Sequence, residues 1–218
     1  QQAQKVEEQI ATDVLSTPIP SLRDNPEILY QAFQERGANN VVHRLMTLGH
    51  HAVGLNADVG TGKTFILGAV IAELWRRKWE PLVRSISPWR IVYITRASIV
   101  EQTERVMRDK FGLVLGRDVD VTNIDQLRAK FGERFVSERI VIKDGEEHIV
   151  YDWREIIAPV LIILDEAHAV KNVDSTQSKI LQGYSALKGE HYSVYASATM
   201  WTKVIEAQAF AVATRMEW

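Results

Sequence analysis

Short apolar segments alternate with amphipathic segments along most of the 218-residue chain. Five apolar runs have the length and composition of buried strands: Ala52–Asn56, Arg90–Thr95, Val119–Thr122, Val160–Leu164 and His191–Ala196. Segments between them carry apolar residues at helical spacing: Thr64–Arg77, Ser98–Lys110 and Ser175–Leu187. Strands that alternate with helices predict an α/β fold, with a mostly parallel sheet and helices on both of its faces.

The N-terminal region is predicted to be helical as well. Gln1–Ser16 alternates polar and apolar residues at helical spacing. Asp24-Asn25-Pro26 is typical of a helix start with proline at the first helical position. We therefore expect one helix from about Pro26 to Arg36, which Gly37 ends, and a second from Asn39 to Leu48.

A β-hairpin is predicted to interrupt the alternation before the fourth strand. Asp144-Gly145 is the turn pair most typical of a two-residue hairpin loop, and Ile140–Lys143 and His148–Tyr151 flank it. We expect this hairpin to be an insertion in the sheet-forming chain.

Composition excludes several classes of protein. Hydrophobic residues make up 46% and charged residues 25%, which favours a compact globular fold over a disordered or fibrous one. No apolar run approaches the roughly 18 residues that span a bilayer, and no secretory signal is visible, so we expect no membrane partner. The absence of cysteine excludes disulfides and thiolate zinc sites and favours an intracellular location.

Charge gives a mixed indication of a nucleic-acid partner. The net charge of −2 indicates none, but the segment Arg76–Lys110 holds nine Lys or Arg against four Asp or Glu, with tryptophans interleaved. This segment can form a basic face for nucleic acid, or solvated helix faces over buried tryptophans. Both interpretations remain open at this point.

The first motif lies between the predicted strand at Ala52–Asn56 and the helix that follows. Its residues fit a phosphate-binding P-loop: Ala57, Asp58, Val59, Gly60, Thr61, Gly62, Lys63 and Thr64. Glycines let backbone N–H groups close around phosphate oxygens, and a helix N-terminus adds a positive dipole. Lys63 would then contact the β- and γ-phosphates of ATP, and Thr64 would bind Mg²⁺. A chance match at a glycine-rich turn is the alternative.

Two more polar clusters follow predicted strands. Asp165 and Glu166 end the strand at Val160–Leu164, where Asp165 can reach Mg²⁺ and Glu166 can orient and deprotonate an attacking water. An acidic pair at a helix start is the alternative. Ser197-Ala198-Thr199 follows the last strand, and a helix cap is the alternative there.

The order and spacing of the three clusters resemble motifs I, II and III of the first lobe of superfamily 2 helicases, which has a RecA-like P-loop NTPase fold. The resemblance implies a RecA-like lobe over residues 31–218, with ATP and Mg²⁺ as cofactors. It does not cover residues 1–30, which the residue pattern makes an N-terminal helical extension. Because the chain stops at Trp218, it also implies that a second RecA-like lobe, in cis or in trans, completes the ATPase. Four residues would couple the nucleotide to nucleic-acid contacts: His168, Ser197, Ala198 and Thr199.

Within that superfamily, Asp165–Asn172 resembles the extended second motif of the Swi/Snf-type DNA translocases. Ala97–Gln102 and Val121–Leu127 resemble their nucleic-acid-contacting segments, which implies phosphate contacts from Arg96, Ser98 and Thr122. Gln34 matches the adenine-reading glutamine upstream of the P-loop, and Gln31 competes for that role. Ala57, Thr95-Arg96 and Met200 depart from the Swi/Snf pattern.

The resulting hypothesis is a motor lobe that couples ATP hydrolysis to movement on DNA, with duplex DNA as the preferred partner. Two alternatives remain. One is the lobe of an RNA helicase, and the other is a nucleotide-dependent nucleic-acid-binding module without motor activity.

Overall fold

One parallel sheet forms the centre of the molecule. The computed structural model describes residues 12–130, 136–166 and 175–198. Within them, five strands pair in the order β1-β7-β6-β2-β3, and every pairing is parallel. The strands are β1 (Ala52–Asn56), β2 (Ile91–Ile94), β3 (Asp120–Thr122), β6 (Leu161–Asp165) and β7 (Tyr192–Ser197). The predicted strands and their parallel arrangement are confirmed.

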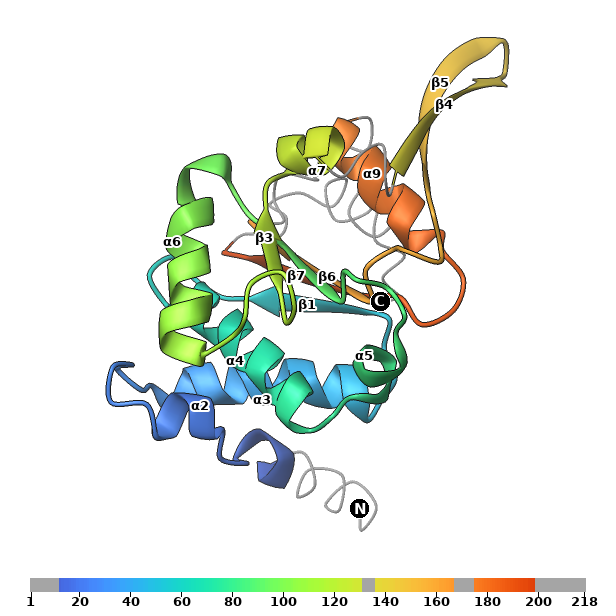
Figure 1. Ribbon diagram of the computed structural model, residues 1–218. Coiled ribbons are helices and arrows are strands. Elements are labelled where there is room, and N and C mark those ends of the chain that lie inside the picture. The colour runs from blue at the N-terminus through green and yellow to red at the C-terminus, as the bar shows by residue number, and fades with distance from the viewer. Residues whose placement is uncertain (1–11, 131–135, 167–174, 199–218) are drawn as a thin grey trace.

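Helices cover both faces of this sheet, as predicted (Figure 1). Odd-numbered β6 residues, Leu161 and Ile163, pack on one face with α3 (Ala32–Met46) and α4 (Lys63–Arg76). Even-numbered β6 residues, Ile162 and Leu164, pack on the other face with Leu127 of α7 (Ile124–Lys130) and with α9 (Thr176–Ser185). Alternation of apolar side chains therefore divides the core into two layers, because successive strand residues point to opposite faces.

Helices on the α4 side follow the predicted pattern closely. α4 is buried along most of its length, and Gly68 within it leaves room for the ring of Phe111. The helical stretch after β2 consists of η1 (Ala97–Ile99), α6 (Val100–Arg105) and the π-helical turn η2 (Val106–Lys110). Short helices α2 (Pro20–Arg23) and α5 (Glu80–Arg84) complete this side. No helix in the described ranges is both long and apolar enough to cross a membrane.

The prediction of two separate helices over Pro26–Leu48 is wrong, because one helix covers most of this stretch. The Asn25 side chain accepts a hydrogen bond from the Glu27 N–H (3.0 Å), which makes a turn where a helix start was predicted. A single helix, α3, then runs through Gly37. One glycine costs a helix about 1 kcal/mol, and burial of the α3 face against α4 and β1 outweighs this cost.

The segment before α3 packs into the same core. Residues 12–15 are helical and Ser16 lies in a turn, while residues 1–11 of the predicted first helix lie outside the described residues. Ile19 and Leu22 are fully buried with α3 and α4. Buried Glu35 ties this segment down, since its carboxylate accepts hydrogen bonds from the Ile19 N–H (2.8 Å), Arg23 (2.7 and 2.6 Å) and Tyr30 (2.9 Å).

The hairpin prediction is confirmed, and the hairpin is longer than predicted. β4 (Val136–Lys143) and β5 (Glu146–Trp153) pair antiparallel around Asp144 and Gly145, whose φ angles of 55° and 84° match a type I′ turn. Trp153 anchors the base by donating a hydrogen bond to the Ile180 carbonyl (2.8 Å). The hairpin projects from the body of the molecule above α9 (Figure 1).

Removing the Glu35 charge should destabilise the fold in a pH-dependent way. Burial raises the pKa of Glu35, but the hydrogen bonds from Arg23, Ile19 and Tyr30 outweigh burial and hold it below the ordinary value of 4.5. The ionised Glu35 carboxylate therefore stabilises the folded state fully above about pH 4.5. This stabilisation is lost as the pH falls through the lower pKa that Glu35 has in the folded state. We expect Glu35→Gln to reduce the free energy of unfolding by about 2 kcal/mol at pH 7.

Urea unfolding at a series of pH values measures this difference. Glu80→Gln is the matched control, because Glu80 and its partner Arg84 are both largely exposed, and exposed pairs contribute little. A difference between wild type and Glu35→Gln that stays constant below pH 4.5 would contradict the assignment.

Candidate functional site

The carboxyl ends of the strands bring the three predicted motifs to one edge of the sheet. Asn56 pairs in register with Ser197, and Asp165 pairs with Ala196. The Ala57 N–H donates a hydrogen bond to the Ser197 carbonyl (3.1 Å). The glycine-rich loop therefore begins beside the end of β7, and Asp165 lies one strand further along. Crevices outside the carboxyl ends of parallel strands are where such sheets bind ligands.

The loop between β1 and α4 has a backbone that only glycine adopts easily. Gly60 and Gly62 have φ angles of 82° and 77°. Asp58 closes a turn, because its carbonyl accepts from the Thr61 hydroxyl (2.7 Å). α4 begins at Lys63, whose ammonium donates to the Ala57 carbonyl (3.4 Å) across the loop. The loop thus has the turn and the helix N-terminus that the P-loop prediction requires.

Gln34 lies against this loop from the side of α3. Its Nε2 donates to the Thr61 carbonyl (3.1 Å), and a Cβ added at Gly62 would come within 2.7 Å of the same nitrogen. Gln31, the competing candidate for adenine contact, is exposed at the start of α3. The structure therefore brings Gln34, and not Gln31, to the loop.

Asp165 is buried at the end of β6. Its carboxylate accepts hydrogen bonds from the Tyr93 hydroxyl (3.0 Å) and from the Glu166 N–H (3.0 Å). Burial raises the pKa of Asp165 above its ordinary value, the Tyr93 hydrogen bond partly opposes this, and the Glu166 charge adds to it. The positive charge of Lys63 also acts to lower the pKa of Asp165.

Tyr93 connects Asp165 to the start of α4. The Thr64 side chain at the start of α4 is close enough to the Tyr93 hydroxyl to affect its pKa. Burial raises the pKa of Tyr93 well above its ordinary value, so the phenol stays protonated and can donate to the carboxylate. This contact was not predicted, because Tyr93 lies inside an apolar run and a core position is the usual interpretation of such a residue.

Glu166 has an unusual backbone. Its φ of 64° lies in the left-handed region, which is uncommon for residues other than glycine. The side chain is 24% exposed and lies 3.6 Å from the Arg96 guanidinium, which is 59% exposed. Strained backbones cluster at functional sites, so this observation is consistent with a functional role for Glu166.

The remaining predicted residues are placed differently from one another. Arg96 and Ser98 are exposed after β2, at the carboxyl edge of the sheet. Thr122 is buried, and its hydroxyl hydrogen-bonds Asn123 and Gln126 (both 3.3 Å), so the side chain does not reach the surface. Ser197 is buried beside the loop and Ala198 is partly exposed. His168 and Thr199 lie outside the described residues.

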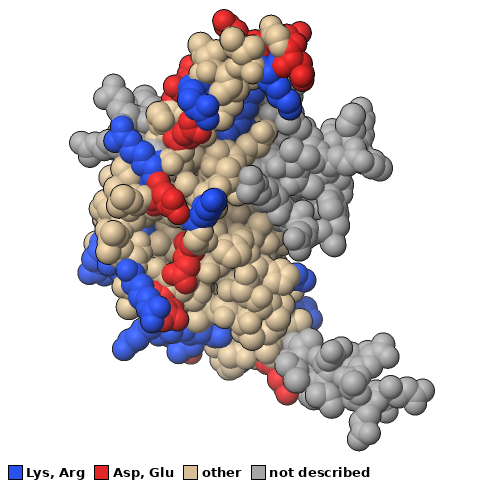
Figure 2. Space-filling model, turned by 90° about the vertical axis from the view of Figure 1, so that its right-hand side faces the viewer, with Lys and Arg blue, Asp and Glu red and all other residues tan. Residues whose placement is uncertain are grey.

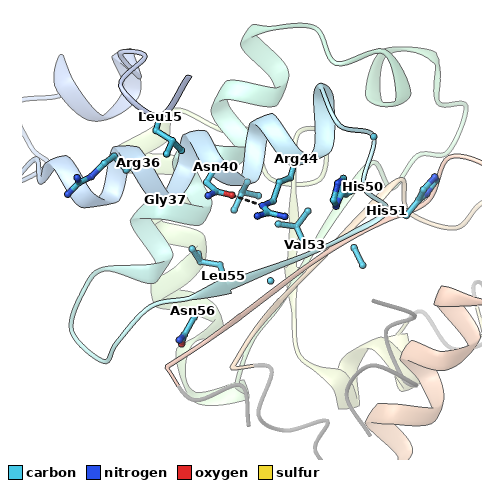
Figure 3. A pocket seen from close by; sticks show the side chains of 14 residues that line it. Leu15, Arg36, Gly37, Asn40, Arg44, His50, His51, Val53, Leu55 and Asn56 are labelled. Carbon is cyan, nitrogen blue, oxygen red and sulfur yellow. Dashed lines mark hydrogen bonds between the residues drawn. The ribbon is translucent and has the colours of Figure 1, made fainter. Parts of the chain in front are cut away.

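Two hollows lie near the sheet. One of about 220 Å³ opens between the ends of β2, β3 and β6 and the start of α9, and Arg96, Asn123, Asp165 and Glu166 line it. A wider one of about 900 Å³ follows β1 and the outer face of α3, where Arg36, Asn40 and Arg44 lie in a row (Figure 3). The wider hollow contains neither Lys63 nor Asp165, so its size does not make it the site.

The donor atoms at the carboxyl edge fit Mg²⁺. Thr64 offers a hydroxyl and Asp165 a carboxylate, both hard oxygen ligands of the kind that this cation takes in small numbers beside phosphates and waters. In the part of the chain that the structure describes, no group of three or more His, Asp or Glu side chains could hold a metal.

Charges on the molecular surface are mixed. On the face shown in Figure 2, Lys and Arg alternate with Asp and Glu. Arginines of the Arg76–Lys110 segment form ion pairs, Arg76 and Arg77 with Glu73, Arg84 with Glu80, and Arg108 with Asp109. Trp79 is buried, as the core interpretation of this segment predicts.

Comparisons with known proteins give one family and a shared fold. A family model described as DEAD/DEAH box helicase matches residues 33–207. A search of curated proteins gives no match. The structure of the DEAD-box helicase Mss116 bound to ssRNA and UDP-BeF matches with a TM-score of 0.55 at 13% identity, over 95% of this chain and 43% of that chain. A Dbp5 variant from S. cerevisiae bound to a Gle1 variant and IP6 matches with a TM-score of 0.46 at 16% identity, over 82% of this chain and 43% of that one.

These findings confirm the prediction of a RecA-like helicase lobe. The chain spans less than half the length of each of the two solved structures. The finer resemblance to the Swi/Snf-type DNA translocases gains no support from these comparisons.

Adding a methyl group at Gly62 should disturb the loop in two separable ways. Gly62→Ala puts a Cβ on a left-handed backbone, which should destabilise the fold by about 1 kcal/mol. The added Cβ also collides with the Gln34 amide. Urea unfolding should show a larger loss for Gly62→Ala than for Gly116→Ala, because Gly116 has a similar φ of 79° with nothing near its Cβ position. When Gln34 is also replaced by alanine, the extra loss of unfolding free energy in Gly62→Ala should vanish. An excess that persists there would show that Gln34 is not the obstacle.

Proposed function

Because the chain belongs to the DEAD/DEAH box helicase family, we propose that it is the ATP-binding lobe of a nucleic-acid-dependent ATPase of superfamily 2. The observation that carries this proposal is the convergence of the glycine-rich loop, Lys63, Thr64 and Asp165 at one edge of a parallel sheet. A chance glycine-rich turn does not account for a buried carboxylate at the same edge of the sheet.

Each residue of the proposed ATP site has a distinct part. The N–H groups of residues 58–63 and the α4 N-terminus cradle the phosphates, and the Lys63 ammonium leaves the Ala57 carbonyl to contact the β- and γ-phosphates. Thr64 and Asp165 would hold Mg²⁺, which would neutralise charge on the phosphates. Gln34 holds the Thr61 carbonyl and is the candidate for adenine contact.

Glu166 is the proposed general base. Its carboxylate follows Asp165 directly, is partly exposed and can accept a proton from a water positioned in line with the γ-phosphate. Arg96 offsets its negative charge on one side. This pair also places a proposed nucleic-acid contact beside the proposed base, so occupation of one site can affect the other.

The end of β7 is the proposed link between the ATP site and the nucleic-acid contacts. Ser197 shares the end of β7 with the loop through the Ala57 hydrogen bond, so a shift of the loop would move the segment that includes Ser197, Ala198 and Thr199. We assign coupling to this segment and to His168.

A second RecA-like lobe, in cis or in trans, would supply the arginine that such ATPases use to stabilise the transition state.

RNA is the polymer that the comparisons favour. The solved DEAD-box helicase with the higher TM-score is bound to ssRNA, whereas no comparison supports duplex DNA. DNA remains the second candidate because of the Asp165–Asn172 resemblance to DNA translocases. Arg96 and Ser98 are exposed at the carboxyl edge and can contact phosphates of either polymer.

Two substitutions separate binding from catalysis in the ATP site. Lys63→Ala should weaken Mg-ATP binding at least about tenfold, because a charge-assisted contact to two phosphates contributes roughly 1.5–3 kcal/mol. Glu166→Gln should leave the affinity within about twofold, because the base contacts water and not the phosphates. Titration calorimetry measures the Mg-ATP affinity of both variants in this chain. Wild-type affinity in Lys63→Ala would remove the P-loop assignment.

The polymer and its contact residue can be tested by fluorescence anisotropy over a salt series. With three to five phosphate contacts, log K against log[salt] should have a slope of about −2 to −4 on single-stranded RNA. Arg96→Ala should reduce that slope by about 0.7. Arg84→Ala is the matched control, since Arg84 is an exposed arginine on α5, before the amino end of β2. Tighter binding to duplex DNA than to RNA of equal length would favour the DNA translocase.

A further inference from the structure

A buried phenol joins the two side chains that are proposed to hold the cation. Tyr93 lies in the middle of β2, is fully buried, and packs on the α4 face of the sheet with Ile91 and Ile163. Its hydroxyl donates to Asp165 Oδ2 at 3.0 Å and lies near the Thr64 side chain, which affects its pKa. A single oxygen therefore lies between a residue of α4 and a residue of β6, which are separated by about 100 positions in the sequence.

Core packing does not explain this hydroxyl. Burying a hydroxyl is unfavourable unless it is hydrogen-bonded, and phenylalanine would fill the same volume without a polar atom. Neighbouring residues of β2, Ile91, Val92 and Ile94, are apolar. Among the described residues, the hydroxyl donates its hydrogen bond to Asp165, so the polar atom is directed at the site.

The strand holds the phenol rigidly. Tyr93 pairs in register with Ile163 of β6 on one side and with Val121 of β3 on the other. A side chain in the middle of a three-strand ladder has little freedom to move, and its ring is enclosed by the core. The Tyr93 hydroxyl is therefore a fixed point, against which the Thr64 and Asp165 side chains are oriented.

We propose that Tyr93 is a positioning residue of the cation site, whose hydroxyl orients the Thr64 hydroxyl and the Asp165 carboxylate for a divalent cation bound with the nucleotide. This inference rests on the proposed ATP site. Outer groups that orient metal ligands typically change metal affinity by 10- to 100-fold when they are removed. Tyr93 does not contact the nucleotide and should not affect its binding in the absence of metal.

Tyr93→Phe tests the proposal, because it removes the oxygen and keeps the ring. Calorimetry with the non-hydrolysable analogue AMP-PNP, in EDTA and over a Mg²⁺ series, gives the metal-free affinity and the half-saturating Mg²⁺ concentration. At about pH 8, which is well above the usual range of a carboxyl pKa, we expect the half-saturating Mg²⁺ concentration to rise about tenfold. The metal-free affinity should stay within about twofold of wild type.

Tyr195→Phe is the matched control. Tyr195 is fully buried in β7, but it packs on the opposite face of the sheet with Tyr184 and Ile162. Its loss of a hydroxyl should leave the Mg²⁺ dependence unchanged. A second comparison uses Asp165→Asn, in which Tyr93→Phe should add little further loss if Tyr93 acts through Asp165. Unfolding midpoints of all variants confirm that each is folded.

The outcomes distinguish a failure of the Tyr93 proposal from a failure of the proposed cation site. Mg²⁺-dependent binding in wild type together with an unchanged Mg²⁺ requirement in Tyr93→Phe would overturn the role of Tyr93 and leave the ATP site intact. Tighter Mg²⁺ binding in the variant, or an equal loss of metal-free affinity, would also overturn it. Nucleotide binding by wild type that does not respond to Mg²⁺ would instead overturn the proposed cation site, and this inference with it.

Discussion

The position of β7 between β1 and β6 sets the geometry of the candidate site. β1 ends in the glycine-rich loop and β6 ends in Asp165, so the width of one intervening strand separates the two motifs. Neighbouring strands lie about 4.8 Å apart, which places the two strand ends about 10 Å from each other. A phosphate group and a hydrated cation fit between groups at that spacing. The register is equally important, because a slip of one residue would turn Asp165 to the opposite face of the sheet, away from α4.

Buried carboxylates in this protein fall into two electrostatic classes. Glu35 and Glu73 are almost fully buried, and arginine hydrogen bonds hold the pKa of each below its ordinary value. Asp165 has a raised pKa, because burial outweighs the Tyr93 and Glu166 hydrogen bonds and the more distant Lys63 charge. The first class is compensated within the fold and is structural. Asp165 has too little compensation for its charge, and a positively charged ligand would supply it, which is the pattern expected at a binding site.

Sequence patterns predicted the sheet and the positions of its polar ends, because apolar strands and glycine-rich turns are local signals. The Asp144-Gly145 hairpin was predictable for the same reason. Helix boundaries before β1 were not, since Gly37 ends a helix by local propensity but is held within α3 by packing on α4. Two features of the site could not be foreseen. The Tyr93 contact depends on a residue in α4 and another in β6, and the left-handed backbone of Glu166 has no signature in the residue type.

Consecutive residues of α3 link the loop to the N-terminal segment. Gln34 holds the Thr61 carbonyl, while Glu35 binds Ile19 and Arg23. Residues 34 and 35 differ by about 100° around a helix, so the two side chains point in different directions from one short stretch of backbone. Because both are buried, a shift of this stretch would strain one set of hydrogen bonds or the other. The loop and the N-terminal segment are therefore joined to the core through two consecutive residues of α3.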